Sequence, residues 1–176
     1  MGDSRRFNLM ADLVSRAFPQ FSGCDVADVA GGKGHLQAAL RQRGFRRITT
    51  IDKRHRLAKG RPGQKYGLFK CDTWERYSLV LGMHPDEATD HIVLYGVRQD
   101  VPFVVCPCCI KPDATQFVGK SSGWIAHLTQ LAHQTHEVNR IILPIEGDNI
   151  VLIGTPKRWL RRQPDLGELY TWLHLN

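Results

Sequence analysis

Val26-Ala27-Asp28-Val29-Ala30-Gly31-Gly32-Lys33-Gly34 is the most informative stretch of this sequence. The apolar run at its start, residues 24–30, is typical of a buried β-strand, and a helix is predicted directly after the glycines, over residues 35–43. An acidic residue inside such a strand, followed by glycines that open a helix, indicates a ligand site at the carboxyl edge of a parallel sheet. Glycines at that edge allow the backbone to approach a ligand closely.

On both sides of this stretch, short β-rich runs alternate with helical patterns. Helices are also predicted from near Pro85 and over residues 7–18 and 123–136. The remaining predicted strands cover residues 47–51, 66–71, 77–82, 101–106, 140–145 and 150–154. The last two flank a Glu146–Asn149 turn and should pair as an antiparallel hairpin. The pattern therefore predicts a doubly wound α/β fold: a seven-stranded, mostly parallel sheet with helices on both faces, closed by that hairpin.

Length and composition predict one soluble domain. The chain has 176 residues, 42% of them hydrophobic and 23% charged, which suits a single globular unit. We expect an N-terminal helix (7–18), a core (24–155) and a basic C-terminal extension (156–176). No apolar run reaches the length of about 18 residues that a membrane span needs, and no secretory signal is recognisable at the polar N-terminus. Five cysteines without framework spacing favour reduced thiols and a cytoplasmic location.

The charge balance favours a polyanionic partner. Lys and Arg number 24 against 17 Asp and Glu, a formal net charge of +7. Lys157, Arg158, Arg161 and Arg162 flank Trp159 after the hairpin, so Arg planes and the indole could stack on RNA bases. The alternative is a solvated turn whose Trp159 packs on the domain, followed by an amphipathic stretch from Leu166 to Leu173.

The glycine stretch resembles the donor loop of class I S-adenosylmethionine (SAM) methyltransferases. Their pattern is acid-x-Gly-x-Gly-x-Gly, and the chain reads Asp28-x-Ala30-x-Gly32-x-Gly34, with Gly31 between. A dinucleotide fingerprint would need glycine where Gln37 stands, so SAM is favoured over NAD.

Two further acids extend this resemblance, which covers about residues 24–155. It implies that Asp52, about 20 residues beyond the loop, binds the ribose hydroxyls of SAM and that Asp72 contacts its adenine amino group. The alternative is that the glycines and strand-end aspartates are ordinary turn residues.

His84 and Asp86, after the fourth predicted strand, should face the donor methyl group. We therefore count His84 among the donor-binding residues, and both among the catalytic candidates, as bases for an acceptor hydroxyl. The alternative is a helix start, with Pro85 and acids at the positive end of the dipole. The family's amino-methylating branches carry Asn/Asp-Pro-Pro-Tyr/Phe here, and this chain does not.

A Pro-Cys-Cys motif follows the fifth predicted strand. With the His-x-Asp and Ala-Thr-Asp patterns, it resembles a group of RNA methyltransferases that includes eukaryotic tRNA 2′-O-ribose enzymes. The matching positions are His84, Asp86, Asp90, Pro107, Cys108 and Cys109. Cys108 is a third catalytic candidate, since a thiolate could attack a pyrimidine ring. Packing of small, easily buried side chains is the favoured alternative, and no metal is expected because a second Cys/His pair at zinc spacing is missing.

The sequence thus predicts SAM-dependent methyl transfer to RNA, with a tRNA 2′-hydroxyl favoured as acceptor. Two alternatives stay open. One is a methyltransferase for protein or a small molecule, and the other is a non-catalytic SAM-fold subunit of an RNA-modifying assembly.

Overall fold

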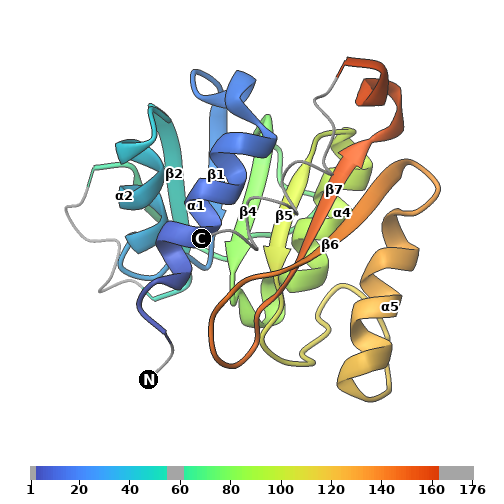
Figure 1. Ribbon diagram of the computed structural model, residues 1–176. Coiled ribbons are helices and arrows are strands. Elements are labelled where there is room, and N and C mark those ends of the chain that lie inside the picture. Colours follow the sequence, from blue (N-terminus) through green and yellow to red (C-terminus); the bar gives the residue numbers. More distant parts are fainter. Residues whose placement is uncertain (1–2, 55–61, 163–176) are drawn as a thin grey trace.

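A seven-stranded sheet runs through the centre of the structure, a computed structural model that describes residues 3–54 and 62–162 (Figure 1). The strand order is β3-β2-β1-β4-β5-β7-β6. The neighbours from β3 to β5 are parallel, whereas β7 lies antiparallel to both β5 and β6. The predicted α/β fold, with a mostly parallel sheet closed by an antiparallel hairpin, is confirmed.

The elements alternate along the chain as predicted. The strands are β1 (Asp25–Val29), β2 (Arg47–Asp52), β3 (Gln64–Tyr66), β4 (Leu79–Met83), β5 (Phe103–Cys106), β6 (His136–Ile142) and β7 (Ile150–Pro156). The α-helices are α1 (Arg6–Ala17), α2 (His35–Gln42), α4 (Thr89–Gln99) and α5 (Ser121–Ala132). Short 3-10 helices are η1 (Pro19–Phe21), η2 (Asp86–Ala88) and η3 (Lys157–Arg162). Within the described residues, no helix is both long and apolar enough to cross a membrane.

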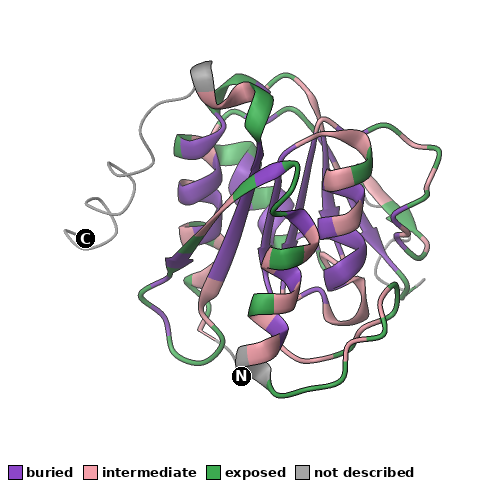
Figure 2. Ribbon diagram, turned by 90° about the vertical axis from the view of Figure 1, so that its right-hand side faces the viewer, coloured by how far each residue is buried: buried purple, intermediate pink, exposed green. Residues whose placement is uncertain are grey.

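Helices cover both faces of the sheet because side chains alternate along each strand. In β1, Val26 packs in the core with α1 and α2, while Ala27 and Val29 pack in the core with α4 and α5. Figure 2 shows the buried strands between the two helical layers. Both faces of the central strands are therefore shielded from water, and polar side chains can reach a bound ligand only at the strand ends.

Several predicted boundaries were wrong, and the helix predicted from near Pro85 begins at Thr89, after η2. The third strand ends at Tyr66 and does not run over 66–71, because Phe69 and Cys71 bury their side chains against the α4 layer without backbone pairing. The last helix ends at Ala132, since the chain from His136 already pairs with the end of β7. The first hairpin strand therefore covers His136–Ile142 instead of 140–145, and its turn is correspondingly longer.

Candidate active site

The loops after β1, β2, β4 and β5 meet at the carboxyl edge of the sheet, because these four strands are parallel neighbours. A pocket, here called the first pocket, lies among them. It is lined by Val29, Ala30, Ile51, Asp52, Lys53, Arg54, Gly67, Leu68, Phe69, Lys70, His84, Pro85, Asp86, Glu87, Ala88, His91 and Asp113. Four of the predicted site residues come together here: Ala30, Asp52, His84 and Asp86.

The glycine loop needs left-handed backbone at three alternate positions. The φ angles are +54° at Ala30, +58° at Gly32 and +77° at Gly34. Alanine stands where the methyltransferase pattern has its first glycine, so its side chain bears some strain. Gly31 is required for a different reason, because a Cβ there would lie 2.2 Å from Oδ2 of Asp28.

Asp28 lies beneath this loop and does not line the pocket. Its side chain is fully buried, and Oδ2 accepts a hydrogen bond from Oγ1 of Thr50 at 2.9 Å. Burial raises the pKa of Asp28 to about 7, with the hydrogen bond from Thr50 opposing the shift. The contact with Gly31 makes Asp28 a support for the loop.

Asp52 links the end of β2 to the glycine loop. Its Oδ2 accepts the backbone N–H of Gly32 at 2.8 Å and Nη2 of Arg54 at 2.8 Å. Its Oδ1 accepts the backbone N–H of Arg54 at 2.9 Å and Nε at 2.8 Å. Burial alone would raise the pKa of Asp52, but the bonds from Arg54 and Gly32 outweigh it and hold that pKa low. All four acceptor positions of the carboxylate are filled.

Asp72 lies outside the first pocket. Because β3 ends at Tyr66, residue 72 stands in an exposed turn well past the strand end. The loop from Gly67 to Lys70 lines the pocket in its place. Leu68 is 63% exposed at this rim, an apolar side chain that the sequence analysis missed and that a ligand ring could cover.

A buried histidine, also missed, holds the same rim. Nδ1 of His91 accepts the backbone N–H of Cys71 at 3.1 Å, so Nε2 carries the hydrogen and donates to Oδ2 of Asp113 at 2.8 Å. Lys70 forms an ion pair with the same carboxylate. The network joins the loop after β3 to α4 and to the segment after β5.

Asp90, one of the motif positions, holds the segment after β5 in place through hydrogen bonds. It is fully buried, and its Oδ2 accepts backbone N–H groups from Asp113, Ala114 and Thr115 at 3.1, 2.9 and 2.9 Å. It is not among the residues that line the pocket.

His84 and Asp86 both adopt left-handed backbone, with φ of +56° and +51°. Such conformations in residues other than glycine cluster at functional sites. Nε2 of His84 lies 2.9 Å from the carbonyl oxygen of Asp148, so this nitrogen carries the hydrogen and Nδ1 of a neutral ring keeps its lone pair. The predicted base at this position thus has a nitrogen that can accept a proton.

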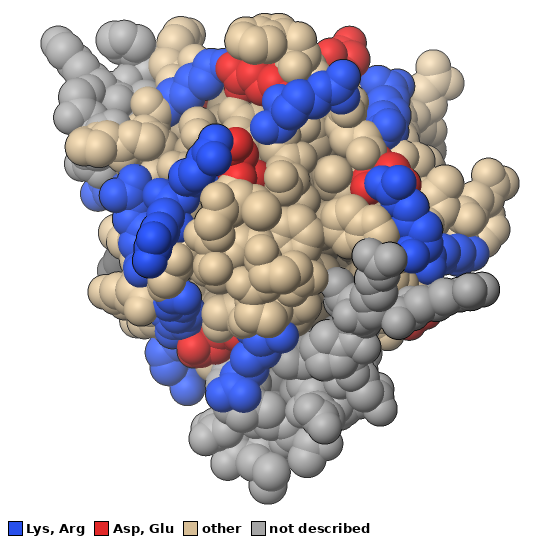
Figure 3. All heavy atoms as spheres, turned by 90° about the horizontal axis from the view of Figure 1, so that it is seen from above, with Lys and Arg blue, Asp and Glu red and all other residues tan. Residues whose placement is uncertain are grey.

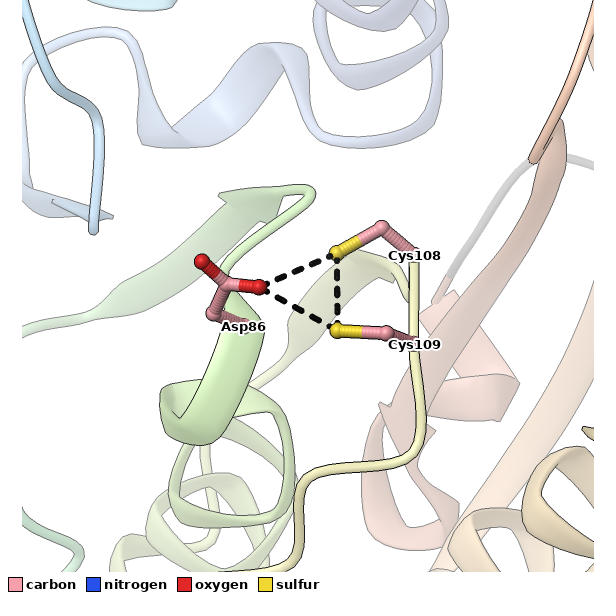
Figure 4. A group of neighbouring side chains, drawn as sticks. All are labelled: Asp86, Cys108 and Cys109. Carbon is pink, nitrogen blue, oxygen red and sulfur yellow. Dashed lines mark hydrogen bonds between the residues drawn. The ribbon is translucent and has the colours of Figure 1, made fainter.

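Asp86 meets the cysteine motif in a three-residue group, here called the Asp86 cluster (Figure 4). Its Oδ1 lies 3.7 Å from Sγ of Cys108, 3.1 Å from Sγ of Cys109 and 2.9 Å from Nζ of Lys111. The bonds from Lys111 and Cys109 hold the pKa of Asp86 below its usual range. Burial and the bond to Asp86 raise the pKa of Cys109 to about 12. Such a thiol is a poor nucleophile, in line with the favoured packing interpretation.

A second pocket lies on the other side of the Asp86 cluster. Its lining residues are Pro107, Cys108, Cys109, Ile110, Trp124, Ile125, Arg140, Gly147, Asp148, Asn149 and Ile150. Asp86 lines the first pocket and both cysteines line the second, so the cluster forms part of the wall between them.

The acids that line the first pocket are all ion-paired. The pairs are Asp52 with Arg54, Glu87 with Lys53, Asp113 with Lys70 and Asp86 with Lys111. Four acids against four bases leave the described part of the pocket with little net charge.

The basic tail lies at the opposite edge of the sheet. Because β7 is antiparallel, its end at Pro156 and the following η3 face away from the glycine loop (Figure 1). Trp159 stacks on Phe21 with ring centroids 5.7 Å apart and planes at 21°, and Arg158 pairs with Asp100. Figure 3 shows that Lys and Arg side chains surround this opposite face. The tryptophan thus packs on the domain, while the predicted stretch from Leu166 to Leu173 lies outside the described residues.

No protein-family model matches the sequence, and neither does any curated protein. Solved structures do match it. A ribosomal protein L11 methylase from Lactobacillus delbrueckii subsp. bulgaricus gives a TM-score of 0.58 at 14% identity over 89% of this chain and 81% of that chain. A SAM-dependent methyltransferase from Aquifex aeolicus gives a TM-score of 0.52 at 9% sequence identity, over 86% of this chain and 93% of that chain.

A third structure was solved with S-adenosylhomocysteine (SAH) bound. This structure, of the calicheamicin-biosynthesis methyltransferase CalO1, gives a TM-score of 0.53 at 16% identity over 87% of this chain and 54% of that chain. All three proteins are described as methylases or methyltransferases, and their likeness to this chain lies in the fold. With its strand order, its antiparallel β7 and its glycine loop after β1, the chain has the fold of class I SAM-dependent methyltransferases.

Proposed function

We propose that this protein is a SAM-dependent methyltransferase. The observation that carries the proposal is the bond from the backbone N–H of Gly32 to Asp52, which joins the glycine loop to the acid at the end of β2. In a doubly wound sheet, ligands bind at this edge, next to the first strand. Three structures with a similar fold are those of a methylase and two methyltransferases, and one of them was solved with SAH.

The residues present fit SAM with one rearrangement. The glycine loop reaches the first pocket at Ala30, with Gly32 beside Asp52 and the Arg54 guanidinium. Leu68 with Phe69 offers apolar surface for an adenine ring. Asp52 is placed to receive the ribose hydroxyls, but all its acceptor positions are filled. The Arg54 side chain, which is about half exposed, would therefore turn outward on binding.

Bound SAM supplies a methyl group on a positively charged sulfur, and the protein positions the acceptor and takes its proton. His84 lines the first pocket on the β4 side and has Nδ1 available as a proton acceptor. The lowered pKa of Asp86 makes it a weaker base, so it suits positioning better than proton transfer. An acceptor in the second pocket would approach past the Asp86 cluster.

RNA is the first acceptor class that we propose, with a ribose hydroxyl as the methylated group. The net charge of +7 supports phosphate contacts. His84 supports hydroxyl chemistry, because a neutral imidazole can remove a hydroxyl proton as the new bond forms.

A small molecule is the second candidate, favoured by the pairing of the pocket acids. Among the described residues, every acid that lines the first pocket is ion-paired, and the basic tail lies at the other edge of the sheet. The second pocket offers Ile110, Trp124 and Ile125 to a compact, partly apolar acceptor.

One labelling experiment separates these candidates. The protein is incubated with methyl-labelled SAM and with separate pools of RNA, protein and small metabolites, and His84→Ala serves as the matched inactive variant. Label in RNA, lost in His84→Ala, is the expected result. Label only among small metabolites selects the second candidate, and label only in protein overturns both. SAH binding without label in any pool would favour a non-catalytic subunit.

A further inference from the structure

The Asp86 cluster brings together three ligand atoms that metals use, from loops far apart in the sequence. Asp86 follows β4, and the two cysteines follow β5, with their side chains pointing toward the carboxylate (Figure 4). The two sulfurs lie 3.5 Å apart, and Oδ1 of Asp86 lies 3.7 Å from one and 3.1 Å from the other. The two thiols and the carboxylate thus form a compact triangle.

The edges of this triangle match a tetrahedral zinc site. Zinc binds thiolate sulfur at about 2.3 Å and carboxylate oxygen at about 2.0 Å. Tetrahedral angles then require sulfurs about 3.8 Å apart and sulfur–oxygen separations of about 3.5 Å. Each observed edge lies within about 0.4 Å of these values, so side-chain adjustments alone could complete the site.

We propose that Asp86, Cys108 and Cys109 bind one Zn²⁺ ion, with the fourth tetrahedral position left to water or to a ligand from either pocket. Thiolate ligands select a thiophilic ion over Mg²⁺ or Ca²⁺, and three protein ligands with one open position are the arrangement of reactive zinc sites. The ion would lie in the wall between the two pockets. Metal binding can be measured without any methyl acceptor, so this proposal stands or falls separately from methyl transfer.

Binding is balanced in protons and charge. Without metal, both thiols donate hydrogen bonds to the same carboxylate oxygen. On binding, both S–H bonds break, the two protons pass to the buffer, and two Zn–S bonds and one Zn–O bond form. The cluster has a charge of about −1 in either state, because the ion's two positive charges offset the two new thiolates.

Lys111 competes with the ion. Its ammonium group donates to Oδ1 of Asp86 at 2.9 Å, the oxygen that the ion would bind. The Lys111 side chain is 54% exposed, so it can swing into solvent. Removing its charge should therefore strengthen zinc binding, an effect that a merely structural cluster would not produce.

The test is zinc loading of the full chain under reducing conditions, followed by removal of free metal and elemental analysis. Wild type should retain about one zinc per chain, and Cys108→Ser, Cys109→Ser and Asp86→Asn should each lose about tenfold in zinc affinity. Cys24→Ser is the matched control, because Cys24 lies before β1 and away from the cluster. Circular dichroism checks that each variant is folded.

Two further measurements sharpen the result. Co²⁺ in place of zinc should give thiolate-to-cobalt charge-transfer absorption in wild type and Cys24→Ser, and clearly weaker absorption in Cys109→Ser, which keeps only one of the two thiolates. Lys111→Ala should bind zinc about threefold more tightly, whereas Lys65→Ala, whose partner is Glu75, should bind as wild type does. Calorimetry in two buffers should count about two protons released per ion.

Three results would overturn the proposed zinc site. Loaded wild type that holds no zinc would overturn the proposal, as would zinc retained equally by folded Cys108→Ser, Cys109→Ser and Asp86→Asn. Cobalt spectra without charge-transfer bands would also overturn it, since the ion would then be bound elsewhere.

Discussion

The backbone N–H of Gly32 donates a hydrogen bond of 2.8 Å to Oδ2 of Asp52, across 20 residues of sequence. This bond fixes the glycine loop after β1 against the end of β2. Together with three bonds from Arg54 it fills every acceptor position of the carboxylate. The donor site therefore has its acid in place but engaged by a neighbouring cation.

Asp52→Asn should weaken SAH binding by about 1 to 3 kcal/mol, because the ribose hydroxyls would lose a charged acceptor. Isothermal titration calorimetry measures the change. Asp25→Asn is the matched control, since Asp25 pairs with Arg47 at the other end of the strands. Equal dissociation constants for wild type and Asp52→Asn would remove Asp52 from the donor site.

Arg54→Ala should bind SAH more tightly than wild type by about 1 kcal/mol, because the ribose would no longer displace a guanidinium from Asp52. Arg47→Ala, which breaks an ion pair at the opposite edge, should leave the affinity unchanged. The same calorimetric titration measures the SAH dissociation constants of both variants. Weaker binding in Arg54→Ala would mean that the guanidinium contacts the donor instead of competing with it.

Gly31→Ala should destabilise the fold by about 3 kcal/mol or more, since the new Cβ would lie 2.2 Å from Oδ2 of buried Asp28. Gly23→Ala places a methyl group where no atom lies within 4 Å, and should change stability by less than about 0.5 kcal/mol. Urea unfolding of both variants gives the comparison. A Gly31→Ala protein as stable as wild type would show that the loop is not packed on Asp28.

Ala30→Gly should stabilise the protein by about 0.5 to 1 kcal/mol, because alanine at φ +54° pays a steric penalty that glycine avoids. The same substitution at Ala38, exposed in the middle of α2, should destabilise by about 1 kcal/mol. Opposite signs in chemical unfolding would confirm that the loop requires left-handed backbone at residue 30. Destabilisation at both positions would contradict it.

Stability should fall between about pH 4 and pH 7 through Asp28. The folded protein keeps this carboxyl protonated up to a pKa of about 7, whereas the unfolded chain releases the proton near 3.8. The folded state thus holds more protons in this window, and the free energy of unfolding falls as pH rises, by a few kcal/mol at most. Asp28→Asn should remove this slope when unfolding is measured at pH 5 and pH 8. The control variant Asp25→Asn should keep the same fall in the free energy of unfolding. If Asp28→Asn also keeps it, the pH dependence belongs to another group.

The amino-acid sequence alone predicted the sheet, its seven strands and the glycine loop. These features depend on local patterns: apolar runs for strands such as β1, helical spacing for α1 and glycines where the backbone turns left-handed. Asp52 could be predicted because it closes a regular strand whose end is clear from its apolar residues. The same approach misplaced the end of the strand before Asp72, since the alternation of Phe69 and Cys71 reflects burial of a loop and not strand pairing.

Only the tertiary structure decided which side chains meet. Asp86 and the two cysteines lie 22 and 23 residues apart in sequence, and they converge because β4 and β5 end side by side. Likewise, the pairing of Trp159 with Phe21 follows from the antiparallel direction of β7, which places the tail beside η1. Contacts of this kind depend on the strand order and direction of the whole sheet, and no local pattern of residues encodes them.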